Sequence, residues 1–444
     1  MQELELAKRT LDDILDNGTP FNEALKKIFQ ADVSLRPLRS LVAGLVGCEL
    51  RHHLLFSSVL AKVGGELNEN EKRYAALTLA DLYFVKRIDK DAMTSGLKEV
   101  LGEEKIVLFA DLFEKSNQPE TLIPEELPKS SNKYLSLRYN TPEWVLKIWE
   151  HFGFGTTYKI LKKNNRPGSE TVRVRTSKIS VESVLNNNPD FASSPIEGML
   201  FYGGKTPLRK MEAYRKGDIF SERLLTKSLL DECHISEPME LFCYNGNKDS
   251  SILKEIIETY GDRIGLNLGV PSLDNCTDVL GMIKRDRLKN VNLFAAPADS
   301  FESAISNPQD LVIAAPDSSN FDLVREEPDF LLHFKKDGMD ALLAQEKEVL
   351  ENCSKYVAEG GTLIYMVYTI SKKEGHQTVA TFLSDHPEFQ LVKEKQCFQY
   401  EELDTAMYYA ILHKDSNVKK EGVPANPLFN PVSNEAASAS IQMK

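Results

Sequence analysis

The sequence predicts an α/β fold in which a doubly wound parallel sheet follows an all-helical region. From about residue 206 onward, short apolar runs of β-type composition alternate with helical patterns, which is typical of such a sheet. Before that, residues 1–118 carry apolar side chains at helical spacing, for example Leu4, Leu11, Leu38 and Leu45. The chain of 444 residues is long enough for two or three domains that each bury a core.

The helical pattern of residues 1–118 predicts a small bundle of about five or six helices. Within it, we expect Asn68 to cap a helix that begins at Glu69 and runs to Val85. The stretch 119–132 is rich in proline and acidic residues and has no periodicity, so it is predicted to be a linker.

Several elements are expected after this stretch. Thr141 is expected to cap a helix that has Pro142 at its first position. Residues 171–176 alternate as a strand does. The large sheet is expected to contain strands near 239–242, 264–268, 291–294, 310–313 and 361–365, with a last antiparallel strand at 407–412. Residues 414–444 are polar and unpatterned, which predicts a disordered tail.

The charge distribution is uneven. The net charge of −12 argues against a protein that coats nucleic acid with its whole surface. Residues 228–444 carry 20 Lys and Arg against 35 Asp and Glu, whereas residues 133–178 carry 10 against 3. This basic island predicts a surface that contacts phosphates, and a solvated face without a ligand is the alternative.

Other classes of protein find no support in the sequence. No apolar run is long enough to cross a bilayer and the chain begins without a basic signal sequence, so a cytoplasmic location is expected. The six cysteines are scattered without CxxC spacing, which predicts reduced thiols and no metal site. No arrangement of serine, histidine and aspartate suggests a hydrolase.

Two segments, 310–319 and 360–370, are predicted to lie at neighbouring strand ends. They resemble the two cysteine-bearing segments of RNA cytosine-5 methyltransferases of the RsmB/Sun family, Asp-Ala-Pro-Cys-Ser-Gly and Tyr-Ser-Thr-Cys-Ser-Ile. Here the cysteine positions hold Asp317 and Tyr368, and the aspartate before Ala-Pro is replaced by Ala314.

Further segments support the same resemblance, which extends to about residue 413. Residues 36–44 are similar to a helix start of the family's NusB-like domain. Residues 135–145 and 164–176 are similar to its entry helix and to the opening of its RRM-like subdomain. The resemblance implies a NusB-like helical domain at 1–118, an RRM-like subdomain at 133–205 and a Rossmann-like methyltransferase domain at 206–413.

The replaced residues matter because the family's reaction is covalent. A cysteine thiolate adds to C6 of the pyrimidine, and the activated C5 then takes a methyl group from S-adenosylmethionine. A thiolate can both attack and leave near neutral pH. Neither Asp317 nor Tyr368, a phenol with an ordinary pKa of about 10, can do both. Cys243 and Cys353 are expected to face the core, so we expect no catalytic residue and no methyl transfer.

Residues 240–249 match the family's cofactor loop only in part. The resemblance implies S-adenosylmethionine as cofactor, with Gly246, Lys248, Asn267 and Asp299 as candidate contacts. Tyr244 is expected to add bulk where the cofactor approaches the backbone.

Ribosomal RNA is the partner that the resemblance implies. RNA binding can persist without catalysis, because contacts to backbone phosphates require only positive charge and hydrogen-bond donors. The candidate RNA-binding residues are Arg166, Arg173, Arg175, Lys178, Lys205 and Arg209. Two alternatives stay open: an active RNA methyltransferase with an atypical site, and a scaffold that binds a protein partner through its helical domain.

Overall fold

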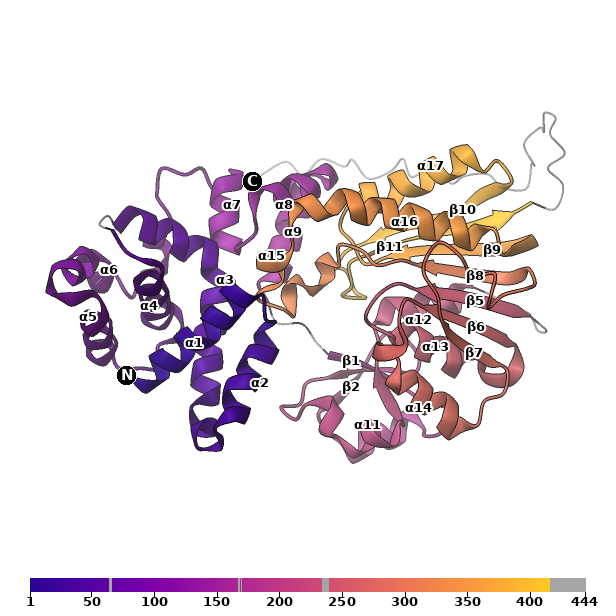
Figure 1. Ribbon diagram of the computed structural model, residues 1–444, viewed down its shortest axis with the longest axis horizontal. Coiled ribbons are helices and arrows are strands. Elements are labelled where there is room, and N and C mark those ends of the chain that lie inside the picture. Colours follow the sequence, from indigo (N-terminus) through magenta and orange to yellow (C-terminus); the bar gives the residue numbers. More distant parts are fainter. Residues whose placement is uncertain (64–65, 167, 169, 234–238, 416–444) are drawn as a thin grey trace, which may run out of the picture.

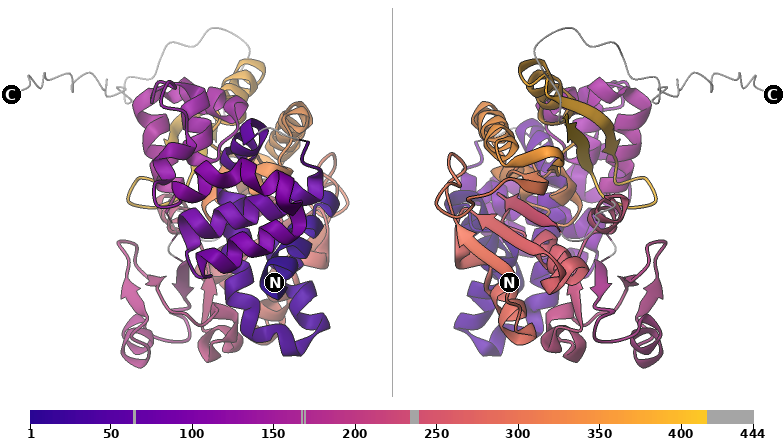
Figure 2. Two further views of the ribbon diagram at one scale, coloured as in Figure 1. Left: turned by 90° about the vertical axis from the view of Figure 1, so that its left-hand side faces the viewer. Right: turned by 90° about the vertical axis from the view of Figure 1, so that its right-hand side faces the viewer.

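The computed structural model describes residues 1–63, 66–166, 168, 170–233 and 239–415. It has an N-terminal helical region, a small four-stranded sheet, and a seven-stranded sheet with helices on both faces (Figure 1). The side views show the small sheet below the large domain and beside the N-terminal helices (Figure 2). Most of the predicted tail, from residue 416 onward, lies outside the described residues.

The N-terminal region is helical, as predicted. Asn68 forms a capping box with Glu71: the Asn68 side chain accepts a hydrogen bond from the Glu71 amide at 2.9 Å, and the Glu71 carboxylate accepts one from the Asn68 amide at 2.8 Å. The α-helices are α1 Gln2–Asn17, α2 Phe21–Ala31, α3 Arg39–Val63, α4 Glu69–Ala80, α5 Lys90–Ile106 and α6 Ala110–Glu114. Whether this bundle is NusB-like stays a prediction.

One part of the predicted linker packs on the helical region. Leu122 and Ile123 are buried in the core of the helical region, and Leu137 of the next helix, α7 Asn132–Tyr139, joins them. The absence of periodicity was misleading because two isolated apolar side chains are enough to dock a short acidic segment.

Asn140 ties α7 to a kink in α3. The kink is at His52, whose φ is −128°, and it removes regular helical hydrogen bonds from the neighbouring backbone. The Asn140 amide nitrogen donates to the Leu50 carbonyl at 2.7 Å, and its oxygen accepts from the Leu54 amide at 2.9 Å. These bonds satisfy backbone groups that the kink leaves free.

Helices α8 Glu143–Trp149 and α9 Phe154–Asn164 pack on the large domain. The Trp149 ring meets Phe321 edge to face, with 5.7 Å between ring centroids. Thr141 does not cap α8, because its hydroxyl donates to the Tyr139 carbonyl and Pro142 occupies the cap position. That part of the prediction is wrong.

The small sheet has the βαββαβ connectivity and the strand order β2-β3-β1-β4 of ferredoxin-like and RRM folds. All its strand pairs are antiparallel. Its elements span residues 170–221 and not 133–205, because the fourth strand follows the second helix. They are β1 Glu170–Val174, α10 Val181–Asn187, β2 Phe191–Ser193, β3 Met199–Tyr202, α11 Glu212–Lys216 and β4 Ile219–Ser221.

The large sheet has the order β10-β11-β9-β8-β5-β6-β7, and β11 is antiparallel to both of its neighbours. The six strands predicted from apolar runs are confirmed, whereas the edge strand β10 was not predicted. The strands are β5 Glu240–Asn245, β6 Gly265–Val270, β7 Val291–Ala295, β8 Gln309–Ala315, β9 Val357–Val367, β10 Phe389–Cys397 and β11 Met407–Lys414.

Helices cover both faces of this sheet and enclose two apolar cores (Figure 1). One layer contains α12 Leu224–Glu232, α13 Ser251–Tyr260 and α14 Thr277–Asp286. The other contains α16 Met339–Ser354 and α17 Thr378–Asp385, and the short helix α15 Phe330–His333 lies toward α8. The loops at the carboxyl ends of β5, β8 and β9 therefore meet at one edge of the sheet, where ligands bind in folds of this kind.

Candidate functional site

The loops after β5 and β8 are in direct contact at this edge. The Gly246 amide donates to the Ala315 carbonyl at 2.8 Å. A Cβ at position 246 would lie 2.7 Å from the Asp317 amide nitrogen, closer than side chains pack. The glycine is thus required because another loop lies against it.

Two asparagine side chains hold these loops together. The Asn245 amide donates to the carbonyls of Asn247 and Asp249, at 3.2 and 2.9 Å. The Asn247 amide donates across to the Pro316 carbonyl at 3.0 Å. The space beside the glycine is therefore taken up by the chain itself.

Tyr368, which the family resemblance aligns with a cysteine, is buried beneath an arginine. The central carbon of the Arg223 guanidinium lies 4.1 Å from the centroid of the Tyr368 ring, and the tyrosine hydroxyl bonds the Thr226 hydroxyl at 3.0 Å. Burial raises the pKa of Tyr368 well above its usual value, although Arg223 opposes the shift. The phenol thus stays protonated at neutral pH and cannot act as a nucleophile.

Arg223 links this tyrosine to two loops. Its guanidinium pairs with Asp249 at 2.9 Å and with Asp322 at 2.8 Å. Burial raises the pKa of Asp322 to about 6 and that of the neighbouring Glu222 to about 8. The role of Arg223 was not predicted, although the sequence places it directly after the acidic residue Glu222.

Asp317, at the other cysteine position, organises a turn. Its Oδ1 accepts hydrogen bonds from the Ser318 amide at 3.0 Å and from the Asn320 side chain at 3.1 Å. Ala314 is fully buried inside β8 and carries no group that could hold a base. Both replacements therefore have roles in the fold.

No cysteine of the chain takes the place of the missing thiols. Cys243 and Cys353 are completely buried, as predicted, and face the two apolar cores. Burial raises the pKa of both thiols well above the usual range, and it also raises the pKa of each of the other four. At neutral pH all six are thiols and not thiolates.

The candidate cofactor contacts do not converge on one ligand. Asn267 lies inside β6, where its amide donates to the Gln309 side chain at 3.1 Å and its oxygen accepts from Asn292 at 3.1 Å. Neighbouring strands thus engage both ends of the Asn267 amide, and its contact with a cofactor stays a prediction. Lys248 and Asp299 are exposed and stay predictions.

Tyr244 also differs from the prediction. Its ring packs against Phe301 in the core, with 4.8 Å between ring centroids, and does not project into the loop. The residues that do fill the loop are Asn245 and Asn247. With Gly246 covered by the next loop and Asn267 engaged, these residues do not fit S-adenosylmethionine in the way that the family resemblance implies.

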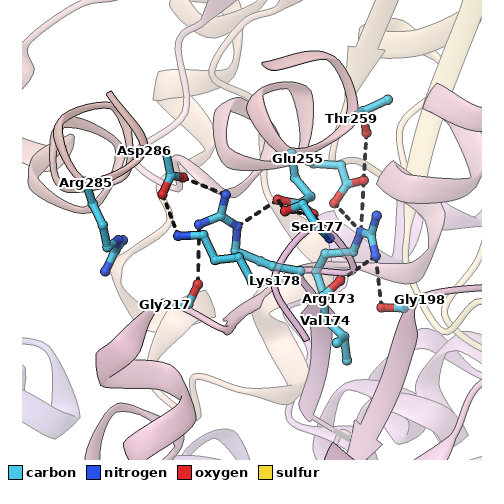
Figure 3. Close-up of polar contacts among 12 residues, drawn as sticks. Arg173, Val174, Ser177, Lys178, Gly198, Gly217, Glu255, Thr259, Arg285 and Asp286 are labelled. Atoms are coloured by element: carbon cyan, nitrogen blue, oxygen red, sulfur yellow. Dashed lines mark hydrogen bonds and ion pairs between the residues drawn. The ribbon is translucent and has the colours of Figure 1, made fainter. Parts of the chain in front are cut away.

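The structure corrects the expectation that Arg173 and Arg175 contact RNA. Both are buried, with 6% and 5% of their surfaces exposed. Arg173 pairs with Glu255 at 3.0 Å (Figure 3). Arg175 pairs with Glu258 and Asp286, both at 2.7 Å. The acids come from α13 and α14, which cover this face of the small sheet. The face that stacks bases in RRM domains is used here to dock the large domain.

The other basic candidates differ in accessibility. Lys178 pairs with Asp286 at the rim of the same junction (Figure 3). Arg166, Lys205 and Arg209 are exposed, and within the described ranges none of their side chains forms an ion pair. These three remain predicted RNA contacts.

The strand order, the antiparallel strand near one edge and the two helical layers define a Rossmann-like methyltransferase fold. No protein-family model matches the chain. The chain is 21% identical over 413 residues to the "Probable ribosomal RNA small subunit methyltransferase B" of Bacillus subtilis, which covers 87% of this chain and 89% of that protein.

Solved structures share the fold. The crystal structure of PH0851 covers 92% of this chain and 98% of its own, with a TM-score of 0.70 and 18% identity. NSun6 from Pyrococcus horikoshii covers 62% of this chain and 98% of its own, with a TM-score of 0.54 and 14% identity. Over residues 1–415, apart from the gaps given above, no helix is long and apolar enough to cross a membrane and no group of side chains could hold a metal ion.

Proposed function

We propose that this chain is a member of the RsmB/Sun family that binds ribosomal RNA and does not transfer a methyl group. The similarity to a protein named as a ribosomal RNA methyltransferase, over most of both chains, supports the RNA partner. The main support for the proposed loss of catalysis is that Tyr368, at a family cysteine position, is buried under Arg223.

The chemistry supports this proposal. The C5 carbon of cytosine is not activated for methylation without a nucleophile that adds to C6 and later leaves. Tyr368 stays protonated, and Asp317 holds a turn. Asp249 and Asp322 are both paired with the Arg223 guanidinium that covers Tyr368, so they are not free to act as bases.

RNA binding survives more readily than catalysis, because a phosphate contact requires only an exposed cation. Arg166, Lys205 and Arg209 meet that requirement. A protein partner of the helical domain and a cytoplasmic location remain predictions.

The first test is a methylation assay. The full chain is incubated with small-subunit ribosomal RNA and S-adenosylmethionine carrying a labelled methyl group, beside a relative that has both cysteines. We expect label in the RNA only with the relative. Label on cytosine with this chain would refute the proposal.

Calorimetric titration with S-adenosylmethionine separates the proposal from the alternative of an active enzyme with an atypical site. We expect no saturable heat, because the loop after β5 is closed by its own asparagines. Binding of the cofactor together with methyl transfer to any RNA atom would favour the alternative.

A further inference from the structure

A pocket of about 300 Å³ lies between the small sheet and the large domain, next to the buried arginine junction, and Arg175 of that junction forms part of its wall. Its walls come from α11 and β4 on one side and from α13 and α14 on the other. Five cations line it: Arg175, Arg209 and Arg215 from the small sheet's side, and Lys254 and Arg285 from the helices. Arg175 is neutralised by Glu258 and Asp286, so among the described residues the other four carry the unpaired charge. A single acidic residue, Asp278, faces them.

Lys254 is the most telling of these residues. Only 8% of its surface is exposed, and its ammonium group lies 5.2 Å from the centroid of the Phe220 ring. Across the described part of the chain it has no ion-pair or hydrogen-bond partner. The Lys254 stem is buried while its ammonium group is open to the pocket, where an anionic ligand would supply a partner.

Arg285 is held at the pocket wall by a glycine. Its guanidinium lies where a side chain of residue 217 would stand: a Cβ there would be 2.7 Å from the Arg285 Cζ (Figure 3). Gly217 also has a φ of 72°, which favours glycine. One Arg285 nitrogen donates to the Lys216 carbonyl at 3.1 Å, and the remaining N–H groups are available to a ligand.

The floor of the pocket is open helix backbone. Gly281 lies in the middle of α14, and an added Cβ there would meet nothing within 4 Å. The pocket also reaches Thr277 in the first turn of α14, where the capping residue, Cys276, makes no side-chain cap. Helix N-termini favour anions, so this turn adds to the field of the four cations.

We infer that this pocket binds a backbone phosphate of RNA. The inference rests on the proposed function and gives RNA a place on the surface. Cations on both walls of the pocket suit a phosphodiester whose RNA strand continues in both directions. The half-buried Tyr214 has a ring beside this position on which a base could stack. Lys254 is one helical turn from the loop after β5, so a strand bound here passes close to the carboxyl edge of the large sheet.

The test uses the full chain and a single-stranded RNA oligonucleotide from small-subunit ribosomal RNA. Affinity is measured by fluorescence anisotropy at several salt concentrations for Lys254→Gln, Arg209→Glu and Arg215→Glu. Lys216→Glu is the matched control, because Lys216 is on the same helix as Arg215, lies outside the pocket and is paired with Glu212 at 2.7 Å.

We expect each pocket variant to weaken binding roughly tenfold and to lower the slope of log affinity against log salt by about 1. The control should change both quantities much less. If Lys254→Gln fails to fold, Arg209→Glu and Arg215→Glu still decide, because both side chains are exposed.

Three results would overturn the inference, and they differ in what they say of the proposed function. Normal RNA binding by all pocket variants would refute the pocket and leave the proposed function intact. Binding of inorganic phosphate or a nucleoside monophosphate, lost in Lys254→Gln, without RNA binding would show a site for small anions only. No binding of RNA or of either small anion would refute both proposals.

Discussion

Two groups of cations lie where the small sheet meets the large domain. Within the described ranges, carboxylates neutralise the first group and leave most of the second group unpaired. Arg173 and Arg175 face Glu255, Glu258 and Asp286, and water is excluded from the contact. The other cations of the adjoining basic pocket, Arg209, Arg215, Lys254 and Arg285, face one carboxylate of its lining, Asp278. Arg175 lies at the boundary, because it also lines this pocket. Lys254 and Glu255 are consecutive on α13, yet they serve different groups.

This difference shows that a basic segment of the sequence does not by itself indicate a binding site. When buried acids face it, its charge holds domains together; when they do not, its charge is left for a ligand. Arg173 and Arg175 belong to the first kind although they lie in the most basic stretch of the sequence. The following predictions test how sharply the two groups differ.

The largest loss of stability should follow removal of an arginine from the buried ion pairs between the small sheet and the large domain. Arg173→Met leaves Glu255 buried without its partner and should lower the free energy of unfolding by about 3–5 kcal/mol. Urea unfolding of the variant measures this loss. Lys178→Met removes a pair at the rim and should cost at most about 1 kcal/mol. Equal losses would mean that the junction is open to water.

The second prediction concerns Glu222, a buried carboxyl close to the acidic residues of this junction. Burial raises the pKa of Glu222 to about 8, and the charges of Glu255 and Asp249 add to the shift. An unfolded glutamate titrates near a pKa of about 4.3, so between pH of about 4.3 and 8 the folded state holds a proton that the unfolded state lacks. Stability should therefore fall as pH rises through this window, by at most about 1.4 kcal/mol per pH unit.

Glu222→Gln should remove that dependence. Its gain in unfolding free energy over the natural chain should be small at pH 5 and largest at pH 8.5 in urea titrations. Glu212→Gln is the control, since Glu212 is exposed and its pKa is lowered by Lys216. A gain that is the same at both pH values would show that Glu222 is ionised throughout.

A smaller effect is expected at the wall of the basic pocket. Gly217→Ala places a methyl group against the Arg285 guanidinium and strains a residue with φ of 72°. Thermal or urea unfolding should show a loss of about 1–2 kcal/mol, and RNA affinity should fall with it because Arg285 is displaced. Unchanged affinity would remove Arg285 from the binding group.

The smallest effect has the opposite sign. Gly281→Ala should stabilise the protein by about 0.5–1 kcal/mol, because alanine is the better helix former and an added methyl meets no atom there. RNA affinity should nevertheless decrease, since the methyl enters the pocket. A variant that is more stable and binds RNA as well as the natural chain would place the phosphate elsewhere.

The strands show where sequence patterns suffice. Those covered on both faces appear as apolar runs and were predicted, whereas β10 was not. Most of its side chains, including Lys393 and Lys395, are partly or fully exposed, as is usual for an edge strand with charged residues, so it has no apolar pattern to read.

The sequence by itself determined the helical region and six of the strands of the large sheet, because these depend on residue types and local spacing. Only the tertiary structure decided which charges are paired. Alternation in and just after β1 favours one face for Arg173 and Arg175. The Arg173 partner Glu255, however, is 82 residues further along the chain. A Coulomb interaction depends on distance and burial, and folding alone sets both.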